Sequence, residues 1–438
     1  MMLPPPEPPL SADRLIRIVR DRFKTIPDNR TKPSISLLDA LLSGFALFHL
    51  KCPSLLAFER ERKCNAFNLQ ALFGIKKIPC DTRMREILDE VAPSYLRPAF
   101  TDIFRCLQRG KCLERFVYFQ GHYLLACDGT THFSSHKIHC KHCLQKRSRN
   151  EVVSYYHQML GMVLVHPDLR EVVPFCPEPI IQQDGTDKGD GERSAAVRAF
   201  AHFRAEHPKL RVIVVEDALS AEGPHIQTLK SHDFRFILSV KPGKQVTLFK
   251  QFEQAELDGE VEVLTLVDPD GTLHHYRWLT DAALNKKYAQ ERVGMLEYWE
   301  IGRQETRHFS WITDLKLDEQ TAPIIARGGR ARWKIENETF NTLKNRDYAF
   351  EHNFGHGENH LGTLFAIMMM LVFLVDQAQQ IGDTLFQSLW EKMGSKRRLW
   401  KRILSLFECF RFKSFRQLYE TLLTFQAVPL PVPALNSS

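Results

Sequence analysis

The spacing of apolar residues changes at Phe116, and this change constrains the fold more than any other feature of the chain. Between Ser11 and about Arg115, apolar residues recur three and four positions apart in successive runs separated by turn signals, which predicts a small helical region. After Phe116, aromatic and aliphatic residues form short runs bounded by polar residues, which predicts strands. The chain therefore combines a helical region with a sheet.

Helix and strand then alternate. Strand patterns occupy 116–128, 152–166, 171–180, 210–217 and 234–240, and helical spacing occupies 191–207. Strands followed by such an alternation are typical of a mixed sheet flanked by helices. Residues 241–320 contain short β-like segments, which predict an antiparallel insertion. Helical spacing resumes at Ala322 and continues to about Thr424.

Composition excludes several classes of protein. With 438 residues, 44% hydrophobic and 25% charged, the chain is neither disordered nor collagen-like nor a coiled coil. A chain of this length does not need a disulfide framework, so its ten cysteines are expected to be reduced thiols in a cytosol. The longest apolar run, Leu364 to Val375, is shorter than the roughly 20 residues that span a bilayer. It predicts a buried helix and no membrane partner.

The net charge of +7 is unevenly distributed. Residues 1–120 carry 20 basic and 13 acidic side chains, and residues 390–420 carry nine and three, so the middle of the chain is net acidic. Basic flanks around an acidic centre are expected if the flanks bind phosphate backbone and the centre gathers carboxylates around a metal. Ordinary solvated surface is the alternative interpretation.

Two carboxylates follow strongly apolar runs. Asp128 comes after YLLAC, and Asp217 ends VIVVED. Open α/β sheets bind ligands at the carboxyl ends of their strands, so two acids at equivalent strand ends indicate a site, whereas either alone is more often a turn or cap residue. Glu336 shares a helical face with Arg332, four residues earlier, although a surface ion pair has the same spacing.

Together these segments resemble the DDE transposases of bacterial insertion sequences. The resemblance is carried by Asp128-Gly-Thr, by Val-Glu-Asp217 with Pro224-His225 after it, and by Arg332-Trp-Lys-Ile-Glu336-Asn. It covers most of the chain, including YYHQML at 155–160 and HNFGHG at 352–357. The similarity is to the branch with a β insertion before the glutamate helix and a tyrosine, arginine, glutamate, lysine signature.

The resemblance implies the site and its ligands. Asp128, Asp217 and Glu336 would hold Mg²⁺ or Mn²⁺, two ions per site, and Arg332 would contact a phosphate near the scissile bond. Double-stranded DNA, as transposon ends and target, would be the partner of a homodimer acting on paired ends, in the cytoplasm of a bacterium and associated with its nucleoid. The helices at 11–115 would recognise the terminal repeats. The other residues predicted to bind DNA are Lys344, Lys396, Arg397, Arg398, Lys401 and Arg402.

Two positions depart from the signature. Gly329 stands where the signature has tyrosine, and Leu343 stands where it has lysine, with Lys344 one residue later. Glu338 is a second acidic residue on the same helix, but it points about 160° away from Glu336. Glu336 is therefore the predicted ligand.

A separate group of possible metal ligands lies in THFSSHKIHCKHCL. Cys140 and Cys143 form half of a tetrahedral zinc site. No second pair follows at finger spacing, so a ligand from elsewhere, such as Cys127 or Cys176, would have to complete the site. The alternative interpretation is a polar loop near the DNA.

The sequence thus predicts an α/β protein with a ribonuclease-H-like mixed sheet flanked by helices. The expected parts are a disordered lead at 1–10, a helical DNA-binding region at 11–115, a catalytic domain at 116–240 and 321–350, a β insertion at 241–320 and a helical region at 351–438. The expected function is DNA transposition by metal-dependent strand cleavage and strand transfer. Alternatives are a nuclease that cuts without joining, and an inactive or zinc-stabilised DNA-binding repressor derived from a transposase.

Overall fold

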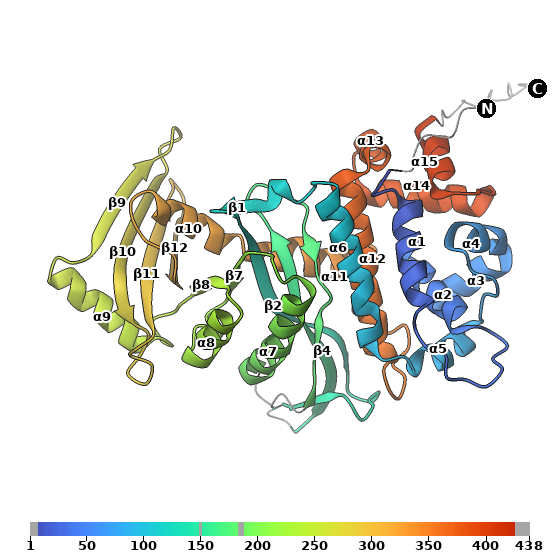
Figure 1. Ribbon diagram of the computed structural model, residues 1–438, viewed down its shortest axis with the longest axis horizontal. Helices are drawn as coiled ribbons and strands as arrows, with labels where there is room; N and C mark the ends of the chain where they lie inside the picture. The colour runs from blue at the N-terminus through green and yellow to red at the C-terminus, as the bar shows by residue number, and fades with distance from the viewer. Residues whose placement is uncertain (1–7, 149–150, 183–187, 425–438) are drawn as a thin grey trace, which may run out of the picture.

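A computed structural model describes residues 8–148, 151–182 and 188–424 (Figure 1). In this part of the chain, one mixed sheet of 12 strands is flanked by helices, so the predicted α/β class is confirmed. The sheet occupies the left and centre of Figure 1, and a body made only of helices lies on the right.

The strands of the sheet lie in the order β3-β4-β2-β7-β8-β12-β11-β10-β9, with β1 beside β2 and with β5 and β6 beside β4. The pairs β2–β7 and β7–β8 are parallel, and the other pairs are antiparallel. All five residues of β7 are buried, as expected of a central parallel strand. The strands are β1 (Val117–Phe119), β2 (His122–Ser135), β3 (Leu144–Arg147), β4 (Val153–Val165), β5 (Val173–Pro174), β6 (Glu178–Ile180), β7 (Val212–Glu216), β8 (Arg235–Ser239), β9 (Glu262–Val267), β10 (Leu273–Ala283), β11 (Arg292–Ile301) and β12 (Thr306–Thr313).

The predicted β insertion contains the four expected strands, β9 to β12, but it is not a separate sheet. Because β12 pairs with β8, the insertion extends the main sheet. It also contains a helix that was not predicted, α9 (Val246–Leu257). Leu248, Phe252 and Ala255, four and three positions apart, are the buried residues of this helix, so its helical spacing was present in the sequence and overlooked.

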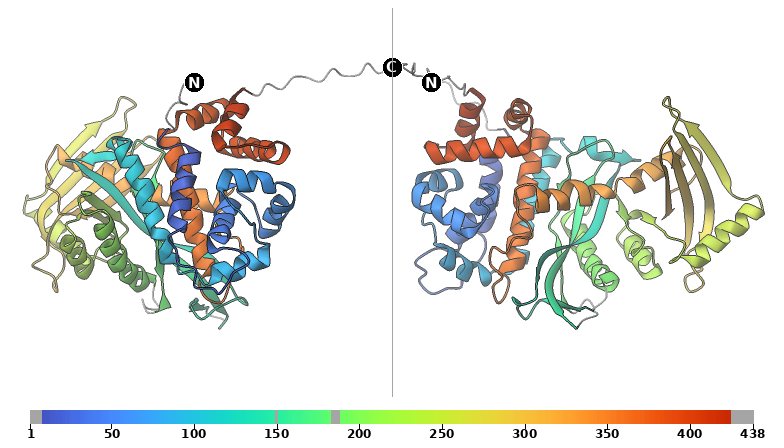
Figure 2. Two further views of the ribbon diagram at one scale, coloured as in Figure 1. Left: turned by 45° about the vertical axis from the view of Figure 1, so that its right-hand side comes forward. Right: turned by 180° about the vertical axis from the view of Figure 1, so that it is seen from behind.

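Helices cover both faces of the sheet. One face carries α7 (Lys188–Glu206) and α8 (Gly223–Ser231), seen in front in Figure 1. The other carries α10 (Thr321–Arg330), η4 (Ile335–Phe340) and α11 (Asn341–Asn345), seen in orange in the right-hand view of Figure 2. Side chains on β2 therefore alternate between the two helical layers.

The N-terminal and C-terminal helices form one body. The side-chain amide of Asn68 donates to the carbonyl oxygens of Phe407 and Phe410, at 2.7 and 2.6 Å. The Asp13 carboxylate accepts the backbone N–H groups of Phe415 and Arg416, both at 2.8 Å. The two basic segments thus belong to the same body. Its helices are α1 (Ala12–Phe23), α2 (Leu37–His49), α3 (Leu55–Cys64), α4 (Ala66–Phe73), α5 (Asp81–Asp89), η1 (Pro93–Leu96), α6 (Arg97–Arg109), η2 (Glu114–Phe116), α12 (Leu361–Gly382), α13 (Thr384–Met393), α14 (Lys396–Cys409) and α15 (Phe415–Thr424).

The apolar helix α12 lies in the core of this body. By length and composition it would cross a membrane, but 89% of its apolar window is buried inside the protein. The prediction of a buried helix is confirmed.

The prediction of a disordered lead at 1–10 is wrong for the last residue of that range. Residues 1–7 lie outside the described residues, as does the tail at 425–438. Leu10, however, is 1% exposed and packs near Gly382 at the end of α12.

Candidate active site

Asp128 lies inside a strand and not at its end. The Asp-Gly pair predicts a turn, but β2 continues to Ser135 because β4 pairs with it well past Asp128, whose partner is Gly161. On the other side of β2, the parallel pairing with β7 ends at Ala126 and Val215. Asp128 therefore lies where the sheet loses one neighbouring strand.

Asp217 directly follows β7, whose last residue is Glu216. Asp128 and Asp217 are each two positions beyond the last pair of the β2–β7 ladder, Ala126 and Val215. Neighbouring strands lie about 4.8 Å apart. The end of β7 thus brings Asp217 toward the part of β2 that carries Asp128, although 89 positions separate the two acids in the sequence. An oxygen of Asp217 accepts the backbone N–H of Leu219 at 2.8 Å, which orients its carboxylate in the turn after β7.

A buried pair supports the strand end that carries Asp217. Glu216, the last residue of β7, lies with its Oε2 2.5 Å from Nε2 of His225 in α8, and both side chains are less than 5% exposed. Successive strand residues point to opposite faces, so Glu216 faces α8 and Asp217 faces away from it. The pair fastens α8 to the end of β7 behind the candidate site.

Two glycines let the glutamate-bearing segment approach the sheet closely. A Cβ at Gly161 would lie 2.9 Å from the ring of Phe340, and a Cβ at Gly328 would lie 2.9 Å from the ring of Tyr118. Because Gly161 is the strand partner of Asp128, the segment from α10 to η4 lies over the face to which Asp128 points.

Gly329, which stands where the transposase signature has tyrosine, has no room for a side chain. The Trp311 indole occupies the space that a side chain at this position would need. A tyrosine there would require Trp311 to move.

Arg332 is brought beside Asp128. Its Nη1 lies 3.5 Å from Oδ2 of Asp128, and the side chain is 11% exposed. The guanidinium also lies over the ring of Trp333, 4.7 Å from the centroid. Oδ1 of Asp128 accepts the backbone N–H of Gly129 at 2.9 Å, so the carboxylate is held between a backbone donor and a cation.

Glu336 lies in η4, a wider π-type turn that follows α10. Ile335 precedes Glu336 and Phe340 follows it in η4, and the side chains of both lie next to the place that a Cβ at Gly161 of β4 would take. The backbone around Glu336 therefore lies over β4 and β2. Glu336 and Glu338 are both half-buried. Within the segment from α10 to η4, Arg332 forms an ion pair with Asp128.

Position 343, where the transposase signature has lysine, lies in the hydrophobic core. Leu343 is fully buried. The Lys344 ammonium lies 2.8 Å from a carboxylate oxygen of Glu351, so it is paired within the chain.

The residues predicted to bind DNA on α14 divide into two groups. Arg397, Arg398, Lys401 and Arg402 are exposed, and Arg397 lies 3.8 Å from Asp347. Lys396 instead turns inward, and burial lowers its pKa. The aromatic side chains of Trp400 and Phe407 belong to the buried face of α14 and so offer no surface for stacking.

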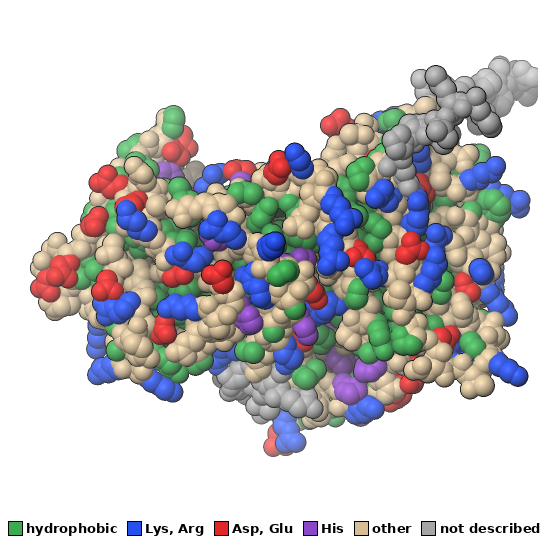
Figure 3. Space-filling view, viewed as in Figure 1, with side chains coloured by type: hydrophobic (Ala, Val, Ile, Leu, Met, Phe, Trp, Pro, Cys, Tyr) green, Lys and Arg blue, Asp and Glu red, His purple; other side chains and the backbone are tan. Residues whose placement is uncertain are grey.

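A second basic surface lies on the helical body. Figure 3 shows Lys and Arg side chains over α1 and α6, on the right of this face. Four arginines of α1 and α6 line a hollow of ≈ 470 Å³ together with Asp21 and Asp102, and Asp102 is ion-paired with Arg22 and Arg105. By contrast, Arg20 packs against Gly74.

We expect the exposed face of α14 to contribute to the salt dependence of DNA binding. Replacing Arg398, Lys401 and Arg402 with Ala should reduce the slope of log K against log salt by up to about 3, because each phosphate contact contributes roughly 0.9. The slope is measured by fluorescence anisotropy at several salt concentrations. As a matched control, Lys241, Lys244 and Lys250, at the far end of the molecule, lose the same charge when changed to Ala. Equal slopes in the two triple variants would mean that these side chains of α14 make no contact with DNA phosphates.

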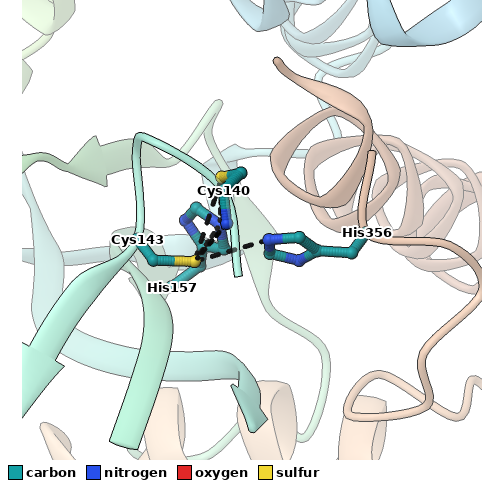
Figure 4. Close-up of side chains that lie close together, drawn as sticks. All are labelled: Cys140, Cys143, His157 and His356. Carbon is teal, nitrogen blue, oxygen red and sulfur yellow. Dashed lines mark hydrogen bonds between the residues drawn. The ribbon is translucent and has the colours of Figure 1, made fainter. Parts of the chain in front are cut away.

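Cys140 and Cys143 lie in the loop between β2 and β3 and meet two histidines that were not predicted as ligands, His157 of β4 and His356 of the loop before α12 (Figure 4). Cys127 and Cys176 do not belong to this cluster. His157 lies in YYHQML, 14 positions from Cys143, and its spacing to the cysteines could have indicated it as a ligand. His356 lies between two glycines in HNFGHG, 213 positions from Cys143, and no local pattern joins it to the cysteines.

No protein-family model and no curated protein matches this chain.

Proposed function

We propose that the chain is a DDE-type DNA transposase, which cuts DNA at the ends of a mobile element and joins those ends to target DNA. The observation that carries the proposal is the placement of Asp128 in β2 and of Asp217 directly after the neighbouring parallel strand β7, with the segment that bears Arg332 and Glu336 packed over β2 and β4. Carboxylates from separate elements can hold the two divalent cations that catalyse phosphoryl transfer by in-line displacement.

The arrangement of strands supports a ribonuclease-H-like sheet. The strands β6, β4, β2, β7 and β8 lie in this order, and only β4 runs opposite to the others. This order and these directions are those expected of a ribonuclease-H-like domain. Of the proposed acids, Asp128 lies in the central strand β2 and Asp217 directly follows the central strand β7.

The donor set suits Mg²⁺ or Mn²⁺. Both cations prefer carboxylate oxygens and retain several waters, so the oxygens of Asp128, Asp217 and Glu336 would be sufficient protein ligands for two ions. Backbone N–H groups orient the two aspartates, and neither acid is fully buried. When bound, such ions activate the attacking oxygen of an in-line displacement and stabilise the leaving one.

The side chains of the protein have complementary roles. Arg332, held over Trp333, would hold the phosphate beside the scissile bond through its planar guanidinium. The basic helical body would bind the DNA on either side, as double-stranded ends and target. We further propose that a homodimer acts on paired ends in a bacterial cytoplasm, in association with the nucleoid.

The test uses labelled DNA carrying the inverted repeats that flank the coding sequence, incubated with Mg²⁺ and with either wild-type protein or Asp217→Ala. Wild-type cleavage and joined products, both absent with Asp217→Ala, are expected. Cleavage without joining would indicate a nuclease. Binding without metal-dependent cleavage would contradict the proposal and favour a repressor.

A further inference from the structure

Four potential metal ligands from three separate segments converge at one edge of the sheet (Figure 4). The Sγ atoms of Cys140 and Cys143 lie 3.9 Å apart. Nε2 of His157 lies 3.6 Å from Sγ of Cys140 and 3.4 Å from Sγ of Cys143. Nε2 of His356 lies 3.4 Å from Sγ of Cys143. All four ligand atoms lie within 4.8 Å of one another.

These separations match the edges of a tetrahedron around one zinc ion. Zn–S bonds of about 2.3 Å and Zn–N bonds of about 2.05 Å place tetrahedral ligands about 3.8 Å apart for two sulfurs and about 3.6 Å apart for sulfur and nitrogen. A two-iron cluster does not fit, because its cysteines and histidines bind different irons, which separates sulfur from nitrogen. Two thiolates and two imidazoles in a tetrahedron are a donor set typical of Zn²⁺.

The surroundings suit a structural metal site. Cys143, His157 and His356 are buried, and Cys140 is half-buried. The ring of Phe133 packs 4.2 Å from that of His356, so an apolar wall shields one side. In the part of the chain that the structure describes, the two Sγ atoms and the two Nε2 atoms are joined by weak hydrogen bonds to sulfur. A single ion would give each of these four atoms a stronger partner.

The chain between α11 and α12 needs such an anchor. Residues 346–360 form neither helix nor strand. Gly355 and Gly357 have φ of +131° and +70°, a conformation that favours glycine, and they present His356 between them. On the opposite side, the Asp89 carboxylate accepts the backbone N–H groups of residues 358–361. The loop is thus held at its end by Asp89 and, at His356, by the cluster.

We propose that Cys140, Cys143, His157 and His356 bind one Zn²⁺ ion, which fastens the loop before α12 to the β2–β3 loop and β4. The site is separate from the carboxylates of the proposed active site and does not depend on the proposed function. Its position just after η4 and α11 means that it would also restrain the end of the segment that carries Glu336.

The first test measures metal in the wild-type protein, expressed without an affinity tag and purified without chelators. Elemental analysis is expected to find one zinc ion per chain. Replacement of zinc by Co²⁺ should give the visible absorption of a tetrahedral cobalt site together with near-ultraviolet charge transfer from thiolate. Wild-type protein that contains no zinc, and that binds no Co²⁺ when one equivalent is added, would overturn the proposal.

The second test identifies the ligands. Cys143→Ser should lose the metal and melt at a lower temperature, whereas the controls His139→Gln and Cys409→Ser, outside the cluster, should retain one ion. A variant that loses the metal can also misfold, so a second variant that keeps four ligands is needed. His356→Cys replaces an imidazole with a third thiolate and should strengthen the thiolate-to-cobalt charge-transfer absorption. An unchanged spectrum in His356→Cys, or full zinc in Cys143→Ser, would contradict the assignment.

Discussion

Asp128→Asn is expected to lower the rate of DNA strand cleavage by more than about 1,000-fold, the scale of loss seen when a central catalytic group is removed. The amide has the shape of the carboxylate, and β2 is held by backbone pairing with β4 and β7, so the fold should persist. The amide lacks the charge that binds a divalent cation and that faces Arg332 at 3.5 Å. Single-turnover cleavage of labelled DNA at saturating protein measures the rate, and anisotropy checks that binding remains.

A matched pair of variants tests the third acid. Glu336→Gln should reduce cleavage as strongly as Asp128→Asn, whereas Glu338→Gln, two positions along the same segment, should stay within a few-fold of wild type. Equal losses in both glutamine variants would mean that the segment matters and the Glu336 carboxylate does not. Wild-type cleavage by Asp128→Asn would remove Asp128 from the reaction.

Asp376→Ala is expected to cost about 3–5 kcal/mol of folding free energy, because it leaves a buried cation without its partner. Asp376 lies within the apolar helix α12 and is 1% exposed. Its carboxylate lies 2.5 Å from the Lys51 ammonium and accepts the hydroxyl of Tyr348. Burial lowers the pKa of Lys51, and the charge of Asp376 opposes that shift. The free energy of unfolding is measured by chemical denaturation.

Two further variants test whether the loss of stability comes from the unpaired charge of Lys51 or from the loss of a side chain in general. Asp376→Leu combined with Lys51→Met removes both charges and should be less destabilising than Asp376→Ala alone. Asp102→Ala breaks the more exposed ion pair with Arg22 and should cost about 1 kcal/mol or less. If the double variant were as unstable as Asp376→Ala, loss of packing and not the unpaired charge would explain the effect.

Elements with strong local patterns were predicted well. The apolar run VIVVED became the central strand β7, and the four segments of the insertion became β9 to β12. Errors occurred where a neighbour in space outweighed a local signal. Asp128-Gly129 looks like a turn, yet β4 keeps the strand extended past it. Lys396 lies in the basic run of α14, yet its ammonium lies over the ring of Trp390, 4.9 Å from the centroid.

The sequence by itself determined the α/β class, the buried character of α12 and the candidate acids, because hydrophobic period and residue chemistry are local properties. Only the tertiary structure decided which distant residues meet. It paired β2 with β7, the strands that carry or precede Asp128 and Asp217, laid Arg332 against Asp128 and joined both basic segments in one helical body. It also brought His356 to Cys143, 213 positions away. Such meetings depend on the pairing of strands and the packing of helices over the whole chain, which no local pattern encodes.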